Sequence, residues 1–233
     1  MRFCANRPLA VICALLFLAG AASAETVEVA PGVQVTKKTW SGPGNEQPFF
    51  GFAVKDAAQQ AADEKFVKAM LDAVGTREKA FEETTKRGWR AVTKGNAGEA
   101  AQRFNQAWLL ASEQSGVYHG FAVIAQMRFR DNDFADEMFR IARKQPNPLK
   151  SLNADYGNML LIAKRPLEAQ EVLEQAVKDA PDLRDAWTNL AWARLQNGDP
   201  IAACAAADEA VKQRPSGNSN TDLTALRSSA QCK

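Results

Sequence analysis

The sequence has 233 residues, of which 46% are hydrophobic and 24% are charged, with 14 glycines and 10 prolines. This is a globular composition, and it excludes a disordered chain or a collagen-like chain. The 29 lysines and arginines nearly balance the 27 acidic residues. A formal net charge of only +2 argues against nucleic acid or an anionic lipid surface as the main partner.

The first 24 residues have the pattern of a secretory signal peptide. Arg2 and Arg7 precede a charge-free apolar run at 9–18, and small residues follow up to Ala24. The run is short for a bilayer span, and no second such run follows. We therefore expect cleavage after Ala24, a mature chain without an integral membrane segment, and a periplasmic or secreted location.

The cysteines that remain after this cleavage are Cys204 and Cys232. An even pair in an oxidising compartment suggests one disulfide, and two unpaired buried thiols are the alternative. Two cysteines and a single histidine, His119, do not make a metal site, so we expect no metal and no cofactor.

A repeat of 34 or 35 residues organises the chain from about residue 81 onward. Each copy places a small residue, an apolar residue four positions later and a small residue three positions after that, which is one face of a helix. The four copies are Ala100, Phe104 and Ala107; Ala135, Phe139 and Ala142; Ala169, Leu173 and Ala176; and Ala203, Ala207 and Ala210. The small residues are expected where two helices approach each other closely.

Each copy is preceded by a second helical pattern that ends in a turn. These turns lie at 94–96, 130–133, 164–166 and 197–200. Prolines at 146, 148, 181 and 215 close the second helices of the last three units. The pattern predicts eight helices in four antiparallel hairpins and no sheet.

The sequence at 185–191, with Asn197, Gly198 and Asp199 and with Ala203, Ala210 and Pro215, resembles the tetratricopeptide repeat (TPR) family. The preceding unit shows the same likeness at Tyr156, Gly157, Ala169, Leu173, Ala176 and Pro181. The resemblance implies an all-α fold, a right-handed α-solenoid of about four hairpins whose first helices line a concave groove.

The segments outside the repeats complete the expected domain organisation. We expect a signal peptide at 1–24, an extended or disordered arm at 25–54, an N-terminal capping helix at 55–75, the solenoid at 76–215 and a C-terminal capping helix at 216–233. The arm carries an apolar cluster, Phe49, Phe50 and Phe52, which either docks on the protein's own helices or binds a partner.

No nucleophile with a base, paired carboxylates in a cleft or phosphate-binding loop is recognisable in the sequence. His119 lies where a packing side chain is expected, and its predicted role is structural. The sequence therefore predicts a protein that is not an enzyme.

Residues one repeat apart should form rows across the concave groove. The predicted peptide-binding residues are Thr85, Trp89, Ile124, Arg128, Asn158, Trp192 and Gln196. Core packing is the alternative interpretation for Trp89 and Trp192.

The sequence thus predicts a non-enzymatic, exported adaptor that binds a peptide or helix of an envelope protein in this groove. The alternative is a structural or assembly component of a secretion or pilus apparatus that acts through its convex face or its N-terminal arm. If the last two helices are antiparallel, Cys204 and Cys232 stand at the same end of that pair, which favours the disulfide.

Overall fold

A computed structural model of the chain describes residues 25–213 and 220–232. The predicted signal peptide at 1–24 and the turn expected at 215–218 lie outside the described residues. In chain order the elements are β1 (Thr26–Ala30), β2 (Val33–Thr36), the short 3₁₀ helices η1 (Gly44–Glu46) and η2 (Pro48–Phe52), α1 (Ala57–Val74), α2 (Arg77–Thr93), α3 (Ala97–Leu110), α4 (Ser115–Phe129), α5 (Asn132–Ala142), α6 (Leu152–Ile162), α7 (Pro166–Asp179), α8 (Arg184–Gln196), α9 (Pro200–Lys212) and α10 (Asn220–Ser229).

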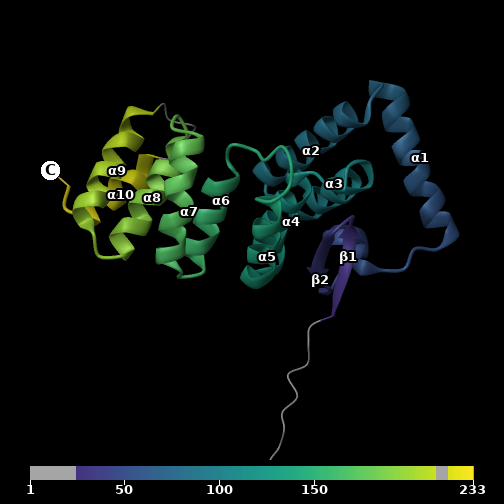
Figure 1. The fold of residues 1–233 in the computed structure, drawn as a ribbon, viewed down its shortest axis with the longest axis horizontal. Helices are drawn as coiled ribbons and strands as arrows, with labels where there is room; N and C mark the ends of the chain where they lie inside the picture. The colour runs from purple at the N-terminus through teal and green to yellow at the C-terminus, as the bar shows by residue number, and fades with distance from the viewer. Residues whose placement is uncertain (1–24, 214–219, 233) are drawn as a thin grey trace, which may run out of the picture.

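The helices pack as antiparallel pairs, as the repeat predicts. The pairs are α2 with α3, α4 with α5, α6 with α7, and α8 with α9. Figure 1 shows them stacked along the long axis of the molecule, from α9 and α10 at one end to α1 at the other. We call α2, α4, α6 and α8 the first helices and α3, α5, α7 and α9 the second helices.

The repeated alanines set the spacing of these pairs. All eight are completely buried: Ala100, Ala107, Ala135, Ala142, Ala169, Ala176, Ala203 and Ala210. A larger side chain at these positions would push the helices apart, because protein interiors are close-packed. The predicted role of the alanines is confirmed.

Glycines in the first helices allow the closest approaches. A Cβ atom on Gly157 would lie 2.3 Å from Cγ of Leu173, across the α6 and α7 pair. A Cβ atom on Gly120 of α4 would lie 2.3 Å from the ring of Phe104 in the preceding pair, and one on Gly88 would lie 3.0 Å from the same ring. Phe104 is fully buried and serves as packing partner for two first helices.

The turns begin and end the helices where the sequence places them. The side chains of Asn96, Asp131 and Asp199 accept hydrogen bonds from backbone N–H groups in the first turns of α3, α5 and α9. Pro166 and Pro200 occupy the first turns of α7 and α9, where a missing N–H has no cost.

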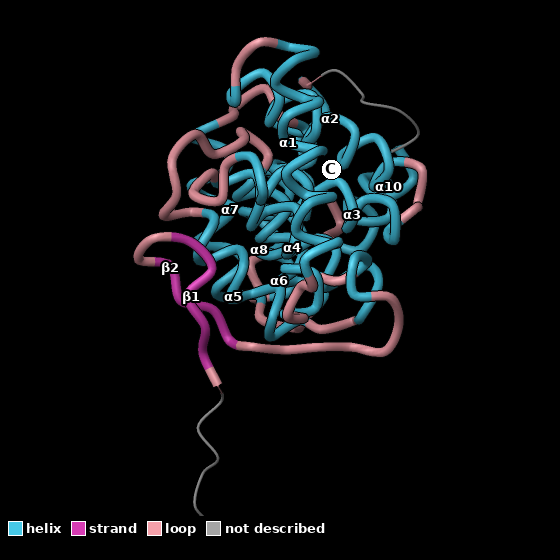
Figure 2. Tube along the Cα trace, turned by 90° about the vertical axis from the view of Figure 1, so that its right-hand side faces the viewer, coloured by secondary structure: helices cyan, strands magenta, loops and turns pink. Residues whose placement is uncertain are grey.

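The N-terminal segment corrects the expectation that the chain has no sheet. β1 and β2 form an antiparallel hairpin in which Val27 faces Val35 and Glu28 faces Gln34, closed by Gly32 at φ 74°. Val29, Val33 and Val35 are buried. The two-residue alternation is visible in the sequence, and the strands form because the helices behind them cover their apolar face. Figure 2 shows the hairpin at the edge of the helical body.

The helix expected at 55–75 is α1, which begins with a capping box at Asp56 and Gln59. It contacts α2 and α3 at the start of the stack. None of its residues is fully buried, and its apolar stripe, with Phe66, Met70 and Leu71, is only half-buried. Its cover over the first pair is therefore shallow.

At the other end, α10 packs on α8 and α9 through Leu223 and Leu226, which are both buried. The predicted disulfide joins Cys204 in α9 to Cys232 just after α10, with the two Cα atoms 5.4 Å apart. The bond closes a loop with a sequence separation of 28. It attaches the last helix covalently to the solenoid.

We predict that replacing both cysteines by serine lowers the free energy of unfolding by about 2–4 kcal/mol, because the unfolded chain regains the freedom of the open loop. Urea denaturation of the oxidised wild type and of the double variant measures this difference. Reductant should shift the wild type toward the double variant and leave the double variant unchanged. Equal midpoints for all samples would contradict the stabilising role.

We also predict that Gly157→Ala lowers the free energy of unfolding by about 1–3 kcal/mol, because the added methyl group overlaps Leu173 in a fully packed interior. Gly116→Ala is the control, since its Cβ would meet its nearest neighbour at 3.4 Å, an ordinary contact. Thermal unfolding should show a loss for the first variant and no loss for the second.

Candidate functional site

The first-helix face is hollowed where α2 meets the loop that joins α5 to α6. Two adjoining hollows, of about 450 and about 490 Å³, share Phe81 and Thr85 of α2 and Asn147 and Leu149 of the loop. Trp89 and Gly116 line the first of them. The centre is apolar, and charged residues of α2, including Glu82, form part of the lining.

The start of α4 holds the loop wall of this hollow in place. The backbone N–H of Ser115 donates to the carbonyl oxygen of Pro146 at 3.2 Å, and its hydroxyl donates to the carbonyl oxygen of Ala142 at 2.8 Å. The side chain of Asn147 donates to Gln114 at 3.1 Å. The loop therefore forms a positioned wall, and it presents Leu149 with 43% of its surface exposed.

Three residues from successive first helices meet below this surface. The ring of His119 in α4 packs edge-on against Trp89 of α2, with centroids 4.7 Å apart. Its Nε2 lies 2.9 Å from a carboxylate oxygen of Asp155 in α6. His119 is 1% exposed, so it is a core residue, as predicted, and it links three helix pairs.

Two polar atoms of this row have no hydrogen-bond partner among the described residues. They are Nε1 of Trp89 and Nδ1 of His119, and both are buried. A buried polar atom without a partner is costly, and each such atom calls for an explanation. The indole of Trp89 thus lines the hollow with an apolar face, and its buried N–H has no acceptor among the described residues.

The predicted peptide-binding residues are not all brought together. Thr85 and Trp89 line the hollow, whereas Asn158, Trp192 and Gln196 lie on α6 and α8, outside the residues that form it. Thr85 also uses its hydroxyl to donate to the carbonyl oxygens of Phe81 and Glu82 in its own helix.

Ile124 corrects the predicted row, because it is completely buried and no ligand can reach it. The helix α4 contacts α2, α3, α5, α6 and η2, so ten of its fifteen residues are buried. The predicted row is therefore accessible at Trp89, Asn158 and Trp192, and it is buried where it crosses α4.

Arg128 is committed to the N-terminal segment instead of the groove. It forms a salt bridge with Glu46 of η1 and packs against the ring of Phe129, 5.7 Å from the ring centroid. On the same side Trp40 stacks on Phe129, with centroids 4.4 Å apart, and its indole N–H donates to Asp131 at 3.2 Å. These contacts fasten the segment before α1 to the second helix pair.

The apolar cluster of the arm docks on the protein's own helices. Phe49 is 5% exposed and packs on Phe121, with centroids 4.6 Å apart, and on Trp108 and Tyr118 at 6.0 and 6.3 Å. The backbone of Phe49 and Phe50 is left-handed, at φ 54° and 55°, which is unfavourable for such residues. Burial of the aromatic side chain offsets that cost.

Phe81, Gly116 and Leu149 were missed as site residues. Phe81 lies one helical turn before Thr85, and Gly116 is one repeat of 35 residues after Phe81, so searching one turn before the predicted residue Thr85 would have found both. Leu149 lies on an irregular loop between repeats, where the spacing carries no information.

The described residues contain no group of three or more His, Cys, Asp or Glu side chains that could hold a metal ion. Within the same part of the chain, no helix is long and apolar enough to cross a membrane.

The fold defines a class of protein: antiparallel helix pairs stacked as in TPR structures. The chain is similar to the structure of PilF from Pseudomonas aeruginosa, with a TM-score of 0.58 and 21% identity over 66% of this chain and 71% of that one. It is also similar to TTC0263, a TPR protein of Thermus thermophilus, with a TM-score of 0.52 and 18% identity over 75% and 94% of the two chains.

A third similar structure is PilW, described as a type IV pilus biogenesis factor, with a TM-score of 0.51 and 13% identity over 76% of this chain and 89% of that one. No protein-family model and no curated protein matches the chain. At these identities the likeness establishes the shared fold.

We predict that Asp131→Asn loosens the arm and lowers the free energy of unfolding by about 1–2 kcal/mol at neutral pH. Burial opposes ionisation of Asp131, but hydrogen bonds from Lys38, the Phe134 N–H and Trp40 outweigh it and hold its pKa below the ordinary value. A lowered pKa in the folded state means that this stabilisation is present above about pH 4 and is lost as the pH falls through the folded-state pKa. The indole N–H resonance of Trp40 reports docking during an acid titration.

Asp133→Asn is the matched control, because Asp133 lies in the first turn of the same helix and caps no backbone N–H there. It should change neither the Trp40 resonance nor the stability by a comparable amount. An Asp131→Asn variant that keeps the wild-type resonance and acid profile would show that the arm is held by packing alone.

Proposed function

We propose that the protein is a non-enzymatic interaction module of the cell envelope that accepts an apolar side chain of a partner peptide or helix in the hollow on its first-helix face. The observation that carries this proposal is the hollow lined by Phe81, Trp89 and Leu149. The hollow has an apolar centre with an aromatic side chain, Trp89, and a polar margin. Binding hot spots in protein interfaces have this composition.

The flanking side chains indicate the kind of ligand. Lys86 and Arg90 of α2 line the hollow together with Glu82, so the margin carries both signs of charge. Such a margin suits a peptide that buries one or two apolar anchors and leaves its backbone near solvent. It does not select for a terminal carboxylate, which requires a convergent set of donors.

Three observations support an envelope location. The first 24 residues have the pattern of a signal peptide, and the Cys204–Cys232 disulfide suits an oxidising compartment. The third is the likeness in fold to PilW, a type IV pilus biogenesis factor. A role as an assembly component of such an apparatus is the second candidate, and an open groove on the second-helix face, described below, favours it.

We predict that Leu149→Asp weakens binding of an apolar peptide selected against the mature chain by about tenfold or more, because the new carboxylate must be desolvated in the hollow. Peptides from a displayed library, measured by calorimetry, provide the ligand. Leu149 is already 43% exposed, so the variant should fold normally.

Leu167→Asp is the matched control, since Leu167 is 72% exposed on α7. It introduces the same charge outside the hollow and should leave the affinity within about twofold of the wild type. Equal affinity for the wild type and for Leu149→Asp, or an equal loss in both variants, would reject the hollow as the binding site.

A further inference from the structure

On the second-helix face, each pair of neighbouring second helices is separated by a first helix that contacts both of them. We call these three equivalent positions grooves. The first groove lies between α3 and α5, the second between α5 and α7, and the third between α7 and α9. Because the repeat is 35 residues in the first step and 34 in the next two, each position in one groove has a counterpart in the next.

The first groove holds the segment of this chain from β1 to η2, which is a β-hairpin followed by two 3₁₀ helices. Three side chains bind its backbone. Asn105 accepts from the N–H of Phe50 at 3.0 Å and donates to the carbonyl oxygens of Gln47 at 2.7 Å and Asn45 at 3.1 Å. Trp108 donates to the carbonyl oxygen of Val29 at 3.0 Å, and Glu137 accepts from the N–H of Thr36 at 2.7 Å.

In the third groove a side chain of the floor contacts both walls. Arg194 of α8 donates to the carbonyl oxygen of Ala202 in α9 at 3.2 Å and lies 3.6 Å from the carboxylate of Glu174 in α7. The long side chain thus bridges the two walls. The counterpart of Arg194 in the second groove is Leu160, which is buried and carries no charge. The two walls of the second groove approach each other through Arg140 and Glu168, at 3.7 Å.

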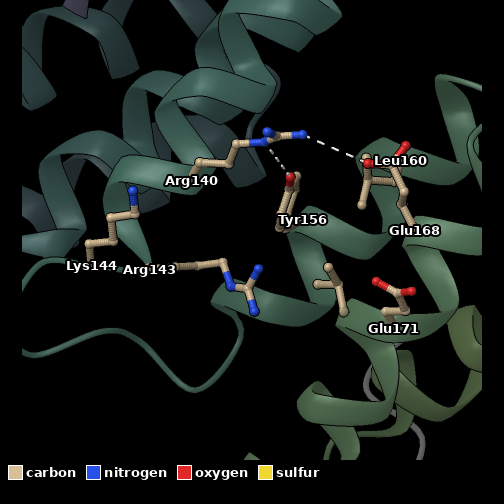
Figure 3. Close-up of a pocket in the computed structure, with 8 residues that line it drawn as sticks. Arg140, Arg143, Lys144, Tyr156, Leu160, Glu168 and Glu171 are labelled. Atoms are coloured by element: carbon tan, nitrogen blue, oxygen red, sulfur yellow. Dashed lines mark hydrogen bonds and ion pairs between the residues drawn. The ribbon is translucent and has the colours of Figure 1, made fainter. Parts of the chain in front are cut away.

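The second groove remains a hollow of about 520 Å³. The counterparts of Asn105, Trp108 and Glu137 are Arg140, Arg143 and Glu171, and all three line it. Figure 3 shows Arg140 and Arg143 extending from α5 toward Tyr156, with Glu168 and Glu171 on the opposite wall. The positions that bind backbone in the first groove are therefore polar and accessible in the second.

Part of the charge in this groove is already neutralised. Arg140 pairs with Asp136 at 2.9 Å and approaches Glu168 at 3.7 Å, and Arg165 pairs with Glu168 at 2.6 Å and with Asp136 at 3.2 Å. The hydrogen bonds from Arg165 hold the pKa of Glu168 below its ordinary value. This network has two positive and two negative groups, and its net charge is zero.

The remaining charges favour a negative ligand. Arg143 and Lys144 on the α5 wall make no ion pair within the described residues, against the single carboxylate of Glu171 on the other wall. The guanidinium of Arg143 lies over the ring of Tyr156, 5.7 Å from its centroid, which orients it toward the groove. Its remaining N–H donors match carbonyl and carboxylate oxygens.

We propose that the groove between α5 and α7 binds an extended acidic segment of another protein. Arg140 donates to its carbonyl oxygens, Glu171 accepts from its backbone N–H groups as Glu137 does in the first groove, and Arg143 pairs with an acidic side chain. Lys144 adds positive charge at the edge of the groove. This site is separate from the hollow on the first-helix face.

The composition of the residues that the structure does not describe does not match an acidic ligand. The residues outside the structure at 1–24, 214–219 and 233 contain no aspartate or glutamate. The arm is bound in the first groove, where neutral Asn105 and Trp108 contact its backbone. Arginines at both counterpart positions select a different, more acidic sequence.

The test uses the full mature chain and two fluorescein-labelled decapeptides, one alternating glutamate with valine and one alternating lysine with valine. We expect the acidic peptide to bind and the basic one to bind at least about tenfold more weakly. Arg143→Glu should weaken the acidic peptide by about tenfold or more, and Arg143→Lys should give an intermediate loss because the charge stays and the planar fork is lost.

Lys178→Glu is the matched control. Lys178 is exposed in the last turn of α7, as Arg143 is at the end of α5, so both substitutions change net charge and helix-end charge alike. It should alter binding by less than about twofold at about 0.15 M salt, where distant charges are screened. No binding to the wild type, or equal losses in Arg143→Glu and Lys178→Glu, would overturn the proposal.

Leu149→Asp separates this site from the first-helix hollow. It should leave the affinity for the acidic peptide unchanged, and Arg143→Glu should leave the affinity for the apolar peptide unchanged. Loss of acidic-peptide binding in Leu149→Asp would place both ligands in one site and reject the second groove.

Discussion

The close approach of paired helices at small residues is the constraint on which the structure depends. Eight alanines without exposed surface and the glycines opposite Phe104 and Leu173 fix how near the helices lie. This spacing determines the width of every groove between neighbouring pairs. The groove between α5 and α7 is a consequence of it, because the separation of neighbouring second helices decides how much space lies between them.

The three grooves on the second-helix face show how one repeated geometry acquires different roles. The three grooves share the same helix arrangement, but the side chains at equivalent positions differ. Asn105 in the first groove corresponds to Arg140 in the second and to Glu174 in the third. The first position binds the chain's own backbone, the second lines an open hollow and the third pairs with Arg194. In a solenoid, a change of a few residues in one unit alters that unit's surface without disturbing the helix packing of its neighbours.

Much of the fold could be predicted because it depends on local periodicity. The spacing of the alanines predicts the buried face of each second helix. The starts of these helices follow from the caps Asn96 and Asp131 and from the prolines at 166 and 200. The disulfide could be predicted from two cysteines at one end of an antiparallel pair. The site was harder, because burial of Ile124 depends on five elements that surround α4, and the wall formed by Leu149 depends on a loop with no repeat. The alternation of the strands is visible in the sequence, but the helices that cover their apolar face are distant along the chain, and no local pattern reveals that contact.

The arm is attached to two neighbouring helix pairs at once, so its length must match the distance between them. Its backbone is fastened to Trp108 at one point and to Glu137 at another, in consecutive second helices. The two anchors lie on neighbouring second helices, so docking of the arm depends on the spacing between the first two pairs. Duplication or loss of a repeat there would leave the arm without one of its anchors. The helices α6 to α9 contact members of their own pair and of the adjacent pair. The arm therefore makes the first two pairs dependent on a fixed number of repeats.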